Sequence, residues 1–353
     1  MTTGSGPVTS PPGLELGALG EYFQVHVPGY RGSLRAEVVA GGRSNLTYRV
    51  TDGGSTWAVR RPPLGGLTPS AHDIGREHRV TSGLRGSGVA VAEAVAYCDG
   101  TDVIGAPFSV AAWVDGRVLR TRADADALTV DELARCSDGL VDQLVRLHAV
   151  PYREFGLETL GRPDGYLRRQ LTRWRAQWDL VATRPLPTVG ALFAALDAAM
   201  PGTGEASIVH GDFRVDNTIL DPDDLSRVRA VVDWELSTLG DPLADLATFL
   251  VYRDPAVDAL LDGPAATAPG FPIQSQLAER YARASGRDIT QLPFYLALAY
   301  FKVAVIAEGV HSRYTQGITV GSGFDRAGAS VPHIIDAGLA AIGGPGAERS
   351  PEP

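Results

Sequence analysis

The chain is poor in cysteine and lysine, and the shortage of cysteine excludes two kinds of stabilising site. It has two cysteines in 353 residues, Cys98 and Cys136, which lie far apart and show no Cys-x-x-Cys or Cys/His spacing. The sequence therefore predicts neither a disulfide framework nor a zinc site, and we expect two reduced thiols. Lys302 is the only lysine, so arginine carries nearly all of the positive charge.

Excess positive charge and long apolar runs are also missing. The formal net charge is -9 and the pI is about 5.3, which argues against nucleic acid or an anionic membrane as the partner. The first residues lack the basic and apolar regions of a signal peptide. The most apolar helical stretch, residues 295–310, is interrupted by Lys302 and Glu308 and is not expected to span a bilayer. We therefore expect a cytoplasmic protein with a small-molecule partner; the oligomeric state stays open.

Strand patterns dominate the first third of the chain and helical patterns dominate the rest. The expected strands, short β-branched or aromatic runs bounded by turn residues, are 34–40, 46–51, 56–61, 94–98 and 107–114, with a polar helix at 70–85. Later helices are expected at 130–148, 164–182, 190–200, 242–252, 273–284, 292–314 and 324–342. We predict an α+β fold with a strand-rich N-lobe (14–114), a mainly helical C-lobe (115–342) and disordered tails (1–13 and 343–353).

The densest polar motif lies in an apolar, strand-like island at residues 207–234. His210, Asp212 and Asn217 have the spacing H-x-D-x-x-x-x-N, and an apolar strand then leads to Asp233. This arrangement is typical of a protein-kinase-like catalytic loop. Asp212 suits the orientation and deprotonation of a hydroxyl nucleophile. The oxygens of Asn217 and Asp233 suit Mg²⁺, and His210 is expected to brace the loop. The alternative is that these residues only form turns.

A longer block supports the kinase interpretation. The segments IVHGDFRVDNTILD and AVVDWELSTLGDPLADLA resemble the aminoglycoside-phosphotransferase-like family. More narrowly, they are similar to the kinase domain that some animals carry fused to acyl-CoA dehydrogenases. The resemblance extends over residues 14–342. It implies a bilobal protein-kinase-like fold that uses ATP and Mg²⁺.

The resemblance also implies a nucleotide site in the N-lobe. Gly41, Gly42, Ser44 and Asn45 lie where kinases place a phosphate-covering loop, and glycine lets backbone N–H groups approach phosphate oxygens. An ordinary hairpin turn is the alternative.

Arginine stands where protein kinases have a lysine on the third strand. Arg60 is the candidate for contacting phosphate and Arg61 competes with it, because strand alternation lets only one of them point inward. Glu77 is the expected ion-pair partner of Arg60. Ala112 and Trp113 are expected to line the adenine slot through backbone groups.

The acceptor site is less defined by the sequence. The candidates, on helices 164–182 and 292–314 and next to Asp233, are Tyr166, Arg169, Glu235, His311 and Arg313. A mixture of arginines and aromatics suits an anionic or acyl-type acceptor, although amphipathic helices with ordinary surface arginines would look the same.

The favoured function is a Mg-ATP-dependent phosphotransferase that moves the γ-phosphate to a hydroxyl of a small molecule, with a hydroxy acid or acyl-CoA-like metabolite as the acceptor class. One alternative is an aminoglycoside-type antibiotic kinase, because fold does not settle substrate. A second is a nucleotide-binding pseudokinase that acts as an interaction module, suggested by the arginine at the lysine position. The preference for ATP over GTP stays open.

Overall fold

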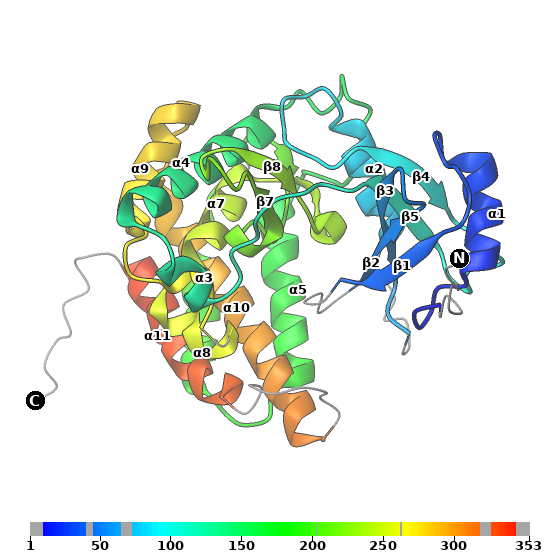
Figure 1. Ribbon diagram of the computed structural model, residues 1–353. Helices are drawn as coiled ribbons and strands as arrows, with labels where there is room; N and C mark the ends of the chain where they lie inside the picture. Colours follow the sequence, from blue (N-terminus) through cyan, green and yellow to red (C-terminus); the bar gives the residue numbers. More distant parts are fainter. Residues whose placement is uncertain are drawn as a thin grey trace, which may run out of the picture.

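Two lobes lie side by side in the molecule, with a β-sheet lobe on the right of Figure 1 and a helical lobe on the left. The structure is a computed structural model that describes residues 10–39, 45–64, 73–202, 204–261, 263–317 and 326–343. The predicted loop residues Gly41, Gly42 and Ser44 and most of both predicted tails lie outside the described residues.

The N-lobe sheet is antiparallel and has the strand order β1-β2-β3-β5-β4. Its strands are β1 (Arg35–Val38), β2 (Leu46–Thr51), β3 (Thr56–Arg61), β4 (Ala94–Cys98) and β5 (Phe108–Ala112). Alternation along β3 buries Trp57, Val59 and Arg61 on one face and turns Ala58 and Arg60 to the other. The first face carries the N-lobe core, and the second faces the C-lobe cavity described below.

Helix α1 (Leu16–His26), which the sequence patterns did not predict, covers the buried face of the sheet. The Phe23 ring meets the Trp57 ring edge-on, with centroids 5.2 Å apart. The chain before α1 is also held: the Tyr48 hydroxyl donates to the carbonyl of Pro12 at 2.7 Å, and Arg61 donates to that of Gly13. The prediction of a disordered tail through residue 13 is therefore wrong at Pro12 and Gly13, because buried polar groups of the sheet use their carbonyls.

Helix α2 (Ile74–Gly83) connects the two lobes. Its N-cap is Asp73, whose side chain accepts a hydrogen bond of 2.8 Å from the N–H of Arg76. Val80 belongs to the large C-lobe core, together with Leu84 just after the helix, while Glu77 on the same helix lines the cavity under β3. The helix therefore fixes the position of Glu77 relative to both lobes.

The C-lobe is built from helices around one core. Its helices are α3 (Arg122–Asp126), α4 (Val130–Ala149), α5 (Tyr166–Val181), α6 (Pro187–Ala198), α7 (Pro242–Val251), α8 (Asp258–Leu261), α9 (Gln274–Ser285), α10 (Leu292–Thr315) and α11 (Ala327–Gly343). By length and composition α10 would pass for a membrane span, but 72% of its most apolar window is buried inside the protein. Its two charged residues in that stretch also have partners: Lys302 donates to Gly211, and Glu308 accepts from Thr183.

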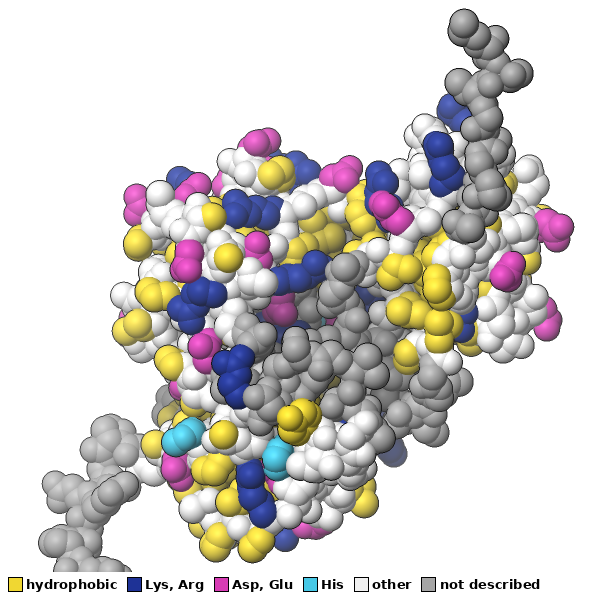
Figure 2. Space-filling model, turned by 60° about the horizontal axis from the view of Figure 1, so that its bottom comes forward, with side chains coloured by type: hydrophobic (Ala, Val, Ile, Leu, Met, Phe, Trp, Pro, Cys, Tyr) yellow, Lys and Arg dark blue, Asp and Glu magenta, His cyan; other side chains and the backbone are white. Residues whose placement is uncertain are grey.

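The predicted strand-like island forms two small antiparallel pairs. Strand β6 (Ser207–Val209) pairs with β9 (Thr238–Gly240), and β7 (Thr218–Leu220) pairs with β8 (Val228–Val231). The segment from His210 to Asn217 joins β6 to β7, and Asp233 follows β8 closely. Pairing of Thr218 with Val231 therefore brings the loop and Asp233 together. On the face in Figure 2, basic side chains are interspersed with acidic and hydrophobic ones.

Candidate active site

The loop after β6 is held from behind by buried polar groups. The carboxylate of Asp245, on α7, accepts the N–H groups of His210 at 2.5 Å and Gly211 at 2.7 Å. The buried His210 ring accepts the N–H of Asp212 on Nδ1 at 3.2 Å, and its Nε2 is 3.0 Å from the carbonyl oxygen of Val232. His210 thus joins the loop to the end of β8, which is the bracing position expected from the sequence.

Asp212 lies at the centre of a polar cluster. Its carboxylate accepts a hydrogen bond of 3.1 Å from the amide nitrogen of Asn217 and pairs with Arg214 Nε at 3.2 Å. The Tyr252 phenol is also hydrogen-bonded to Asp212, and burial raises the pKa of that phenol. Because the nitrogen of the Asn217 side chain is used by Asp212, its amide oxygen is the atom left to serve a ligand.

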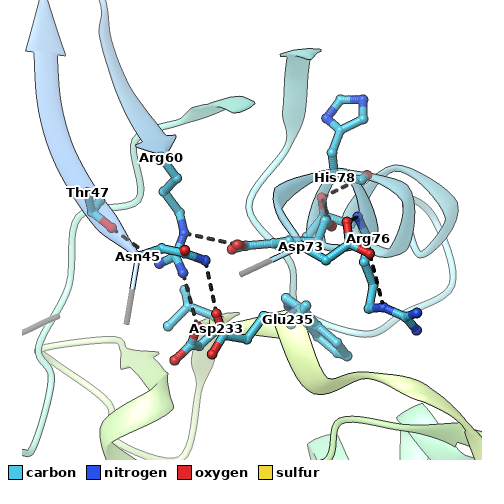
Figure 3. Close-up of polar contacts among 12 residues, drawn as sticks. Asn45, Thr47, Arg60, Asp73, Arg76, His78, Asp233 and Glu235 are labelled. Atoms are coloured by element: carbon cyan, nitrogen blue, oxygen red, sulfur yellow. Dashed lines mark hydrogen bonds and ion pairs between the residues drawn. The ribbon is translucent and has the colours of Figure 1, made fainter. Parts of the chain in front are cut away.

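Arg60 connects the N-lobe to the carboxylate of Asp233 in the C-lobe (Figure 3). Its guanidinium is 3.0 Å from Glu77 Oε2 and 3.0 Å from Asp233 Oδ1. Burial opposes the charge on Arg60, but the carboxylates outweigh it and raise the pKa of Arg60 above its usual value. Burial raises the pKa of Glu77, with Arg60 acting in the opposite direction. Arg61 points into the N-lobe core instead, where it donates to the carbonyl of Ile104 at 3.0 Å.

Asp233 has a backbone conformation that residues other than glycine rarely adopt. Its φ is 69° and its ψ is 56°, in the left-handed region. Such a conformation costs about 1–3 kcal/mol and is often found at functional sites. Here it precedes the short helical turn Trp234–Leu236, in which the buried indole of Trp234 donates to Val231 at 2.9 Å. This packing fixes the residues on either side of the strained position.

A cavity of about 800 Å³ lies between the sheet and the catalytic loop. Arg60, Glu77, Asp212, Asn217 and Asp233 all line it. Its wall also includes small apolar side chains, among them Ala58, Ala92, Ala94, Ala111, Val231 and Ile219. The dimensions and the mixture of apolar walls with a few charged groups are those of a small-molecule or cofactor site.

Ala112 and Trp113 line this cavity as well, next to the connection between the lobes. Their N–H groups are already used, since Ala112 donates to Glu93 at 2.8 Å and Trp113 donates to Thr56 at 3.2 Å. A purine at this edge could therefore contact the carbonyls of Ala112 and Trp113. It could also contact the backbone of the next two residues, Val114 and Asp115. The expectation that Ala112 and Trp113 contact adenine through backbone groups stays a prediction, and the hydrogen bonds limit it to their carbonyls.

Glu235 separates the large cavity from a smaller one and lines both. Its carboxylate accepts a hydrogen bond of 3.0 Å from Asn45, the last of the residues predicted for the phosphate-covering loop (Figure 3). Asn45 is thus joined to the C-lobe next to Asp233. The smaller cavity has a volume of about 330 Å³ and lies on the other side of the loop, against α5 and α10.

The residues present fit magnesium. Within the described part of the chain, no cluster of three or more His, Cys, Asp and Glu side chains converges as a complete metal site. Mg²⁺ does not need one, because it commonly takes one or two carboxylates with waters and substrate phosphates. Asp233 and the amide oxygen of Asn217 line the same cavity and provide hard oxygen donors.

Three residues near the site were missed by sequence reasoning. Arg214 could have been found, because an extended segment points residues 212 and 214 to the same side. Tyr252 lies at the end of α7, 40 residues from Asp212 in sequence, and no local pattern indicates it. Lys302 had one signal, since it is the only lysine and interrupts an apolar helix.

The acceptor candidates divide into two groups. Tyr166 and Glu235 line the smaller cavity. Arg169, His311 and Arg313 line neither cavity. Arg169 donates to the carbonyls of Arg162 and Asp164, just before its helix begins. On α10, Lys302 lines the smaller cavity about two and a half turns before His311. Of the candidates on these two helices, Tyr166 therefore lines a cavity, whereas Arg169, His311 and Arg313 do not.

The architecture, a five-stranded antiparallel sheet packed on a helical lobe with a polar cavity between them, is that of a protein-kinase-like phosphotransferase. The chain belongs to the phosphotransferase enzyme family, which it matches over residues 35–291. This confirms the family resemblance and the fold expected from the sequence.

Individual relatives agree with this assignment. The chain is 37% identical to acyl-CoA dehydrogenase family member 11 of Gallus gallus over 85% of its own length, and it spans only 40% of that relative. A crystal structure of a Ralstonia eutropha JMP134 protein assigned to the aminoglycoside phosphotransferases is 31% identical, with a TM-score of 0.81 over 93% of this chain and 98% of that one. An aminoglycoside phosphotransferase in complex with ADP and hygromycin B shares the fold at 15% identity, with a TM-score of 0.58 over 92% of this chain and 99% of that one.

Proposed function

We propose that the chain transfers the γ-phosphate of ATP, with Mg²⁺, to a hydroxyl group of a small molecule of the hydroxy-acid or acyl-CoA-like class. The observation that carries the proposal is the convergence of Arg60, Asp212, Asn217 and Asp233 on one cavity of about 800 Å³. These groups come from both lobes and from segments far apart in sequence. A positive group, a carboxylate base and oxygen donors for a metal are what phosphoryl transfer requires of a protein.

Asp212 is the proposed base. The new bond forms between the acceptor oxygen and the γ-phosphorus, the bond from that phosphorus to the β-γ bridging oxygen breaks, and the hydroxyl proton passes to the Asp212 carboxylate. Arg214 and Asn217 hold this carboxylate from two sides, which restricts its orientation before the acceptor arrives.

Asn217 and Asp233 are the proposed metal-holding residues, and the metal, when bound, neutralises charge on the transferred phosphoryl group. Arg60 is the proposed phosphate-binding residue of the N-lobe. Its ion pairs with Glu77 and Asp233 keep it extended into the cavity, so the arginine retains the charge and the acidic partner of a phosphate-binding group. This argues against the pseudokinase alternative.

Aminoglycoside phosphorylation is the second candidate, because the Ralstonia relative is assigned that activity. Aminoglycosides carry several amines, and a pocket for them is expected to be acidic. The smaller cavity next to Gly211 is lined by three cations, Arg76, Arg173 and Lys302, and by two carboxylates, Glu235 and Asp245, which already accept hydrogen bonds from Asn45 and from the loop. We therefore place this candidate second.

The test is ATP turnover with a library of hydroxy acids, hydroxyacyl-CoA thioesters and aminoglycosides, read as acceptor-dependent ADP release. For each acceptor that reacts, Asp212→Asn is expected to lower kcat by about 10²–10⁴-fold while AMP-PNP binding in the presence of Mg²⁺ is retained. Asp223→Asn, in an exposed turn of the same segment, is the matched control and should change neither. Wild-type turnover by Asp212→Asn would refute the assignment of the base, and selective turnover of aminoglycosides would favour the second candidate.

A further inference from the structure

The smaller cavity is close to the proposed catalytic base. It has a volume of about 330 Å³ and is lined by Gly211, the residue before Asp212. Glu235 lies on the boundary with the nucleotide cavity and lines both. The remaining wall comes mainly from one face of α5 and one face of α10. A molecule in this cavity would be next to Asp212 on the side away from the nucleotide cavity.

Lys302 is the most unusual group in this wall. It is the only lysine of the chain and projects from the otherwise apolar face of α10. Its ammonium donates to the carbonyl of Gly211 at 2.6 Å. Lys302 is half-buried, and the described residues accept a hydrogen bond from only one of the three donors of its ammonium.

The described acidic residues do not neutralise Lys302 directly. No carboxylate lies within ion-pair distance of its ammonium in the described part of the chain. Asp245 is close enough to act on its charge, but both oxygens of Asp245 are used by the N–H groups of His210 and Gly211. Asp212 also acts on it and is held by Arg214. Burial lowers the pKa of Lys302, and these two carboxylates act in the opposite direction.

A second cation lines the same cavity. The guanidinium of Arg173, on α5, lies 5.5 Å from the ring centre of Trp174. Within the described residues it has no carboxylate partner, whereas Arg175 on the same helix pairs with Asp179 at 3.2 Å. The wall also contains Arg76, which pairs with Asp73 at 3.6 Å, and the carboxylates of Glu235 and Asp245. Lys302 and the exposed Arg173 are the cations of this wall for which no carboxylate partner lies among the described residues.

We propose that this cavity is the acceptor subsite and that Lys302 donates a hydrogen bond to an oxygen of the acceptor. This oxygen belongs either to a carboxylate or to an acyl carbonyl. Arg173 adds affinity only when the oxygen is charged. This rests on the proposed function and adds to it the cavity and the side chains that would select an acyl or carboxylate acceptor. Lys302 acts as a specificity residue, and because it also contacts the carbonyl of Gly211 it places the acceptor beside Asp212.

The single lysine makes a direct binding test possible. Reductive methylation with formaldehyde and borohydride modifies only Lys302 and the N-terminal amine, and peptide mass spectrometry separates the two. We expect a hydroxybutyrate, or its N-acetylcysteamine thioester, to slow methylation of Lys302 about fivefold or more while the N-terminal amine reacts at an unchanged rate. Choline, a cationic alcohol without an amine that formaldehyde can modify, should give no protection. Equal reaction of Lys302 with and without the oxygen compounds, or equal protection by choline, would overturn the proposal.

Kinetics of variants test the same subsite independently. Lys302→Met keeps the length of the side chain and removes its donors, so KM for the reacting acceptor should rise about tenfold or more, the range of a lost charged hydrogen bond. AMP-PNP affinity should not change. Arg173→Gln should raise KM for free hydroxy acids and leave KM for thioesters unchanged, which distinguishes the two sources of the oxygen. Arg175→Gln is the matched control on the same helix and should have no effect.

The two proposals fail in different ways. If no hydroxy acid, thioester or aminoglycoside drives ADP release by the wild-type chain, the proposed function is wrong. If Asp212→Asn keeps wild-type turnover, the assignment of the base is wrong. If an acceptor reacts but Lys302→Met keeps the wild-type KM, only the subsite is wrong. Should Lys302→Met fail to fold, which a circular dichroism melt would show, the methylation experiment on the wild-type chain decides.

Discussion

Asp245 offers the sharpest test of how the catalytic loop is held. Its buried carboxylate accepts the N–H groups of His210 and Gly211 at 2.5 Å and 2.7 Å, and lies 3.4 Å from His148 Nε2. Burial alone would raise the pKa of Asp245, but His148 and the loop N–H groups outweigh it and lower that pKa. Asp245→Asn keeps the shape but replaces one accepting oxygen by an NH₂ group that cannot accept.

The size of the effect follows from these contacts. One loop N–H loses its acceptor, which costs about 1–3 kcal/mol, and the remaining bond loses its charge, which costs about 1 kcal/mol more. Burying an asparagine costs less than burying a carboxylate, which offsets part of this cost, so we expect a net loss of about 2 kcal/mol in the free energy of unfolding. With an unfolding entropy of about 2.1 cal/mol/K per residue over 353 residues, Tm should fall by about 3 °C.

Activity should fall more than stability suggests. Loosening of the backbone at His210 and Gly211 displaces Asp212, and a misplacement of about 1 Å can cost about 10²-fold in kcat. The assay is a differential scanning calorimetry melt with acceptor-dependent ADP release on the same samples. Asp179→Asn, an exposed residue of α5, is the control, with an expected change within about 0.5 kcal/mol. A melt of Asp245→Asn that matches the control would refute the reasoning.

Two other predictions concern stability. A Cβ on Gly139, in α4, would lie 2.1 Å from the Ser226 carbonyl oxygen, so Gly139→Ala should lower the free energy of unfolding in denaturant by about 1–3 kcal/mol. Gly190, in α6, has no atom within 4 Å of such a Cβ, so Gly190→Ala should raise that free energy by up to about 1 kcal/mol. Equal effects of the two substitutions would contradict the packing. Burial lowers the pKa of His148 below its usual value of 6.5, and the groups around the ring are Asp245, Tyr281, Arg287 and Asp241. As the pH falls below 6.5, this histidine therefore binds a proton in the unfolded chain before it does so in the folded one. Stability should therefore fall from about pH 7 to about pH 5, by at most about 1.4 kcal/mol per pH unit from this group, and His148→Gln should flatten the slope measured by urea unfolding; an unchanged slope would assign it to other groups.

The local arrangement of the loop could be predicted because it depends on spacing along the chain. His210, Asp212 and Asn217 lie within eight residues, and the strands on either side are short apolar runs. Strands β2 and β3 were predicted with the bounds that the structure shows, 46–51 and 56–61, because period-2 patterns and turn residues are local signals. Helix α1 was missed because it has two fully buried residues and only a weak apolar stripe.

The choice between Arg60 and Arg61 shows where the sequence was insufficient. Alternation established that only one of them could enter the cavity, but both carry the same charge. The face was decided by α1, which covers the side of the sheet that holds Trp57, Val59 and Arg61 and leaves Arg60 for Glu77 and Asp233. The tertiary structure therefore decided the orientation of this strand.

The sequence by itself determined the fold class, the reaction type and the order of His210, Asp212 and Asn217 along the loop, since these are written in contiguous motifs and periodicities. The tertiary structure decided that Asp245, Tyr252 and Lys302 meet this loop from α7 and α10, and that Arg169, His311 and Arg313 do not line its cavities. The physical reason is that a helical pattern shows that a helix has a buried face but not which element packs on it. Only packing sets which turn of α10 reaches Gly211.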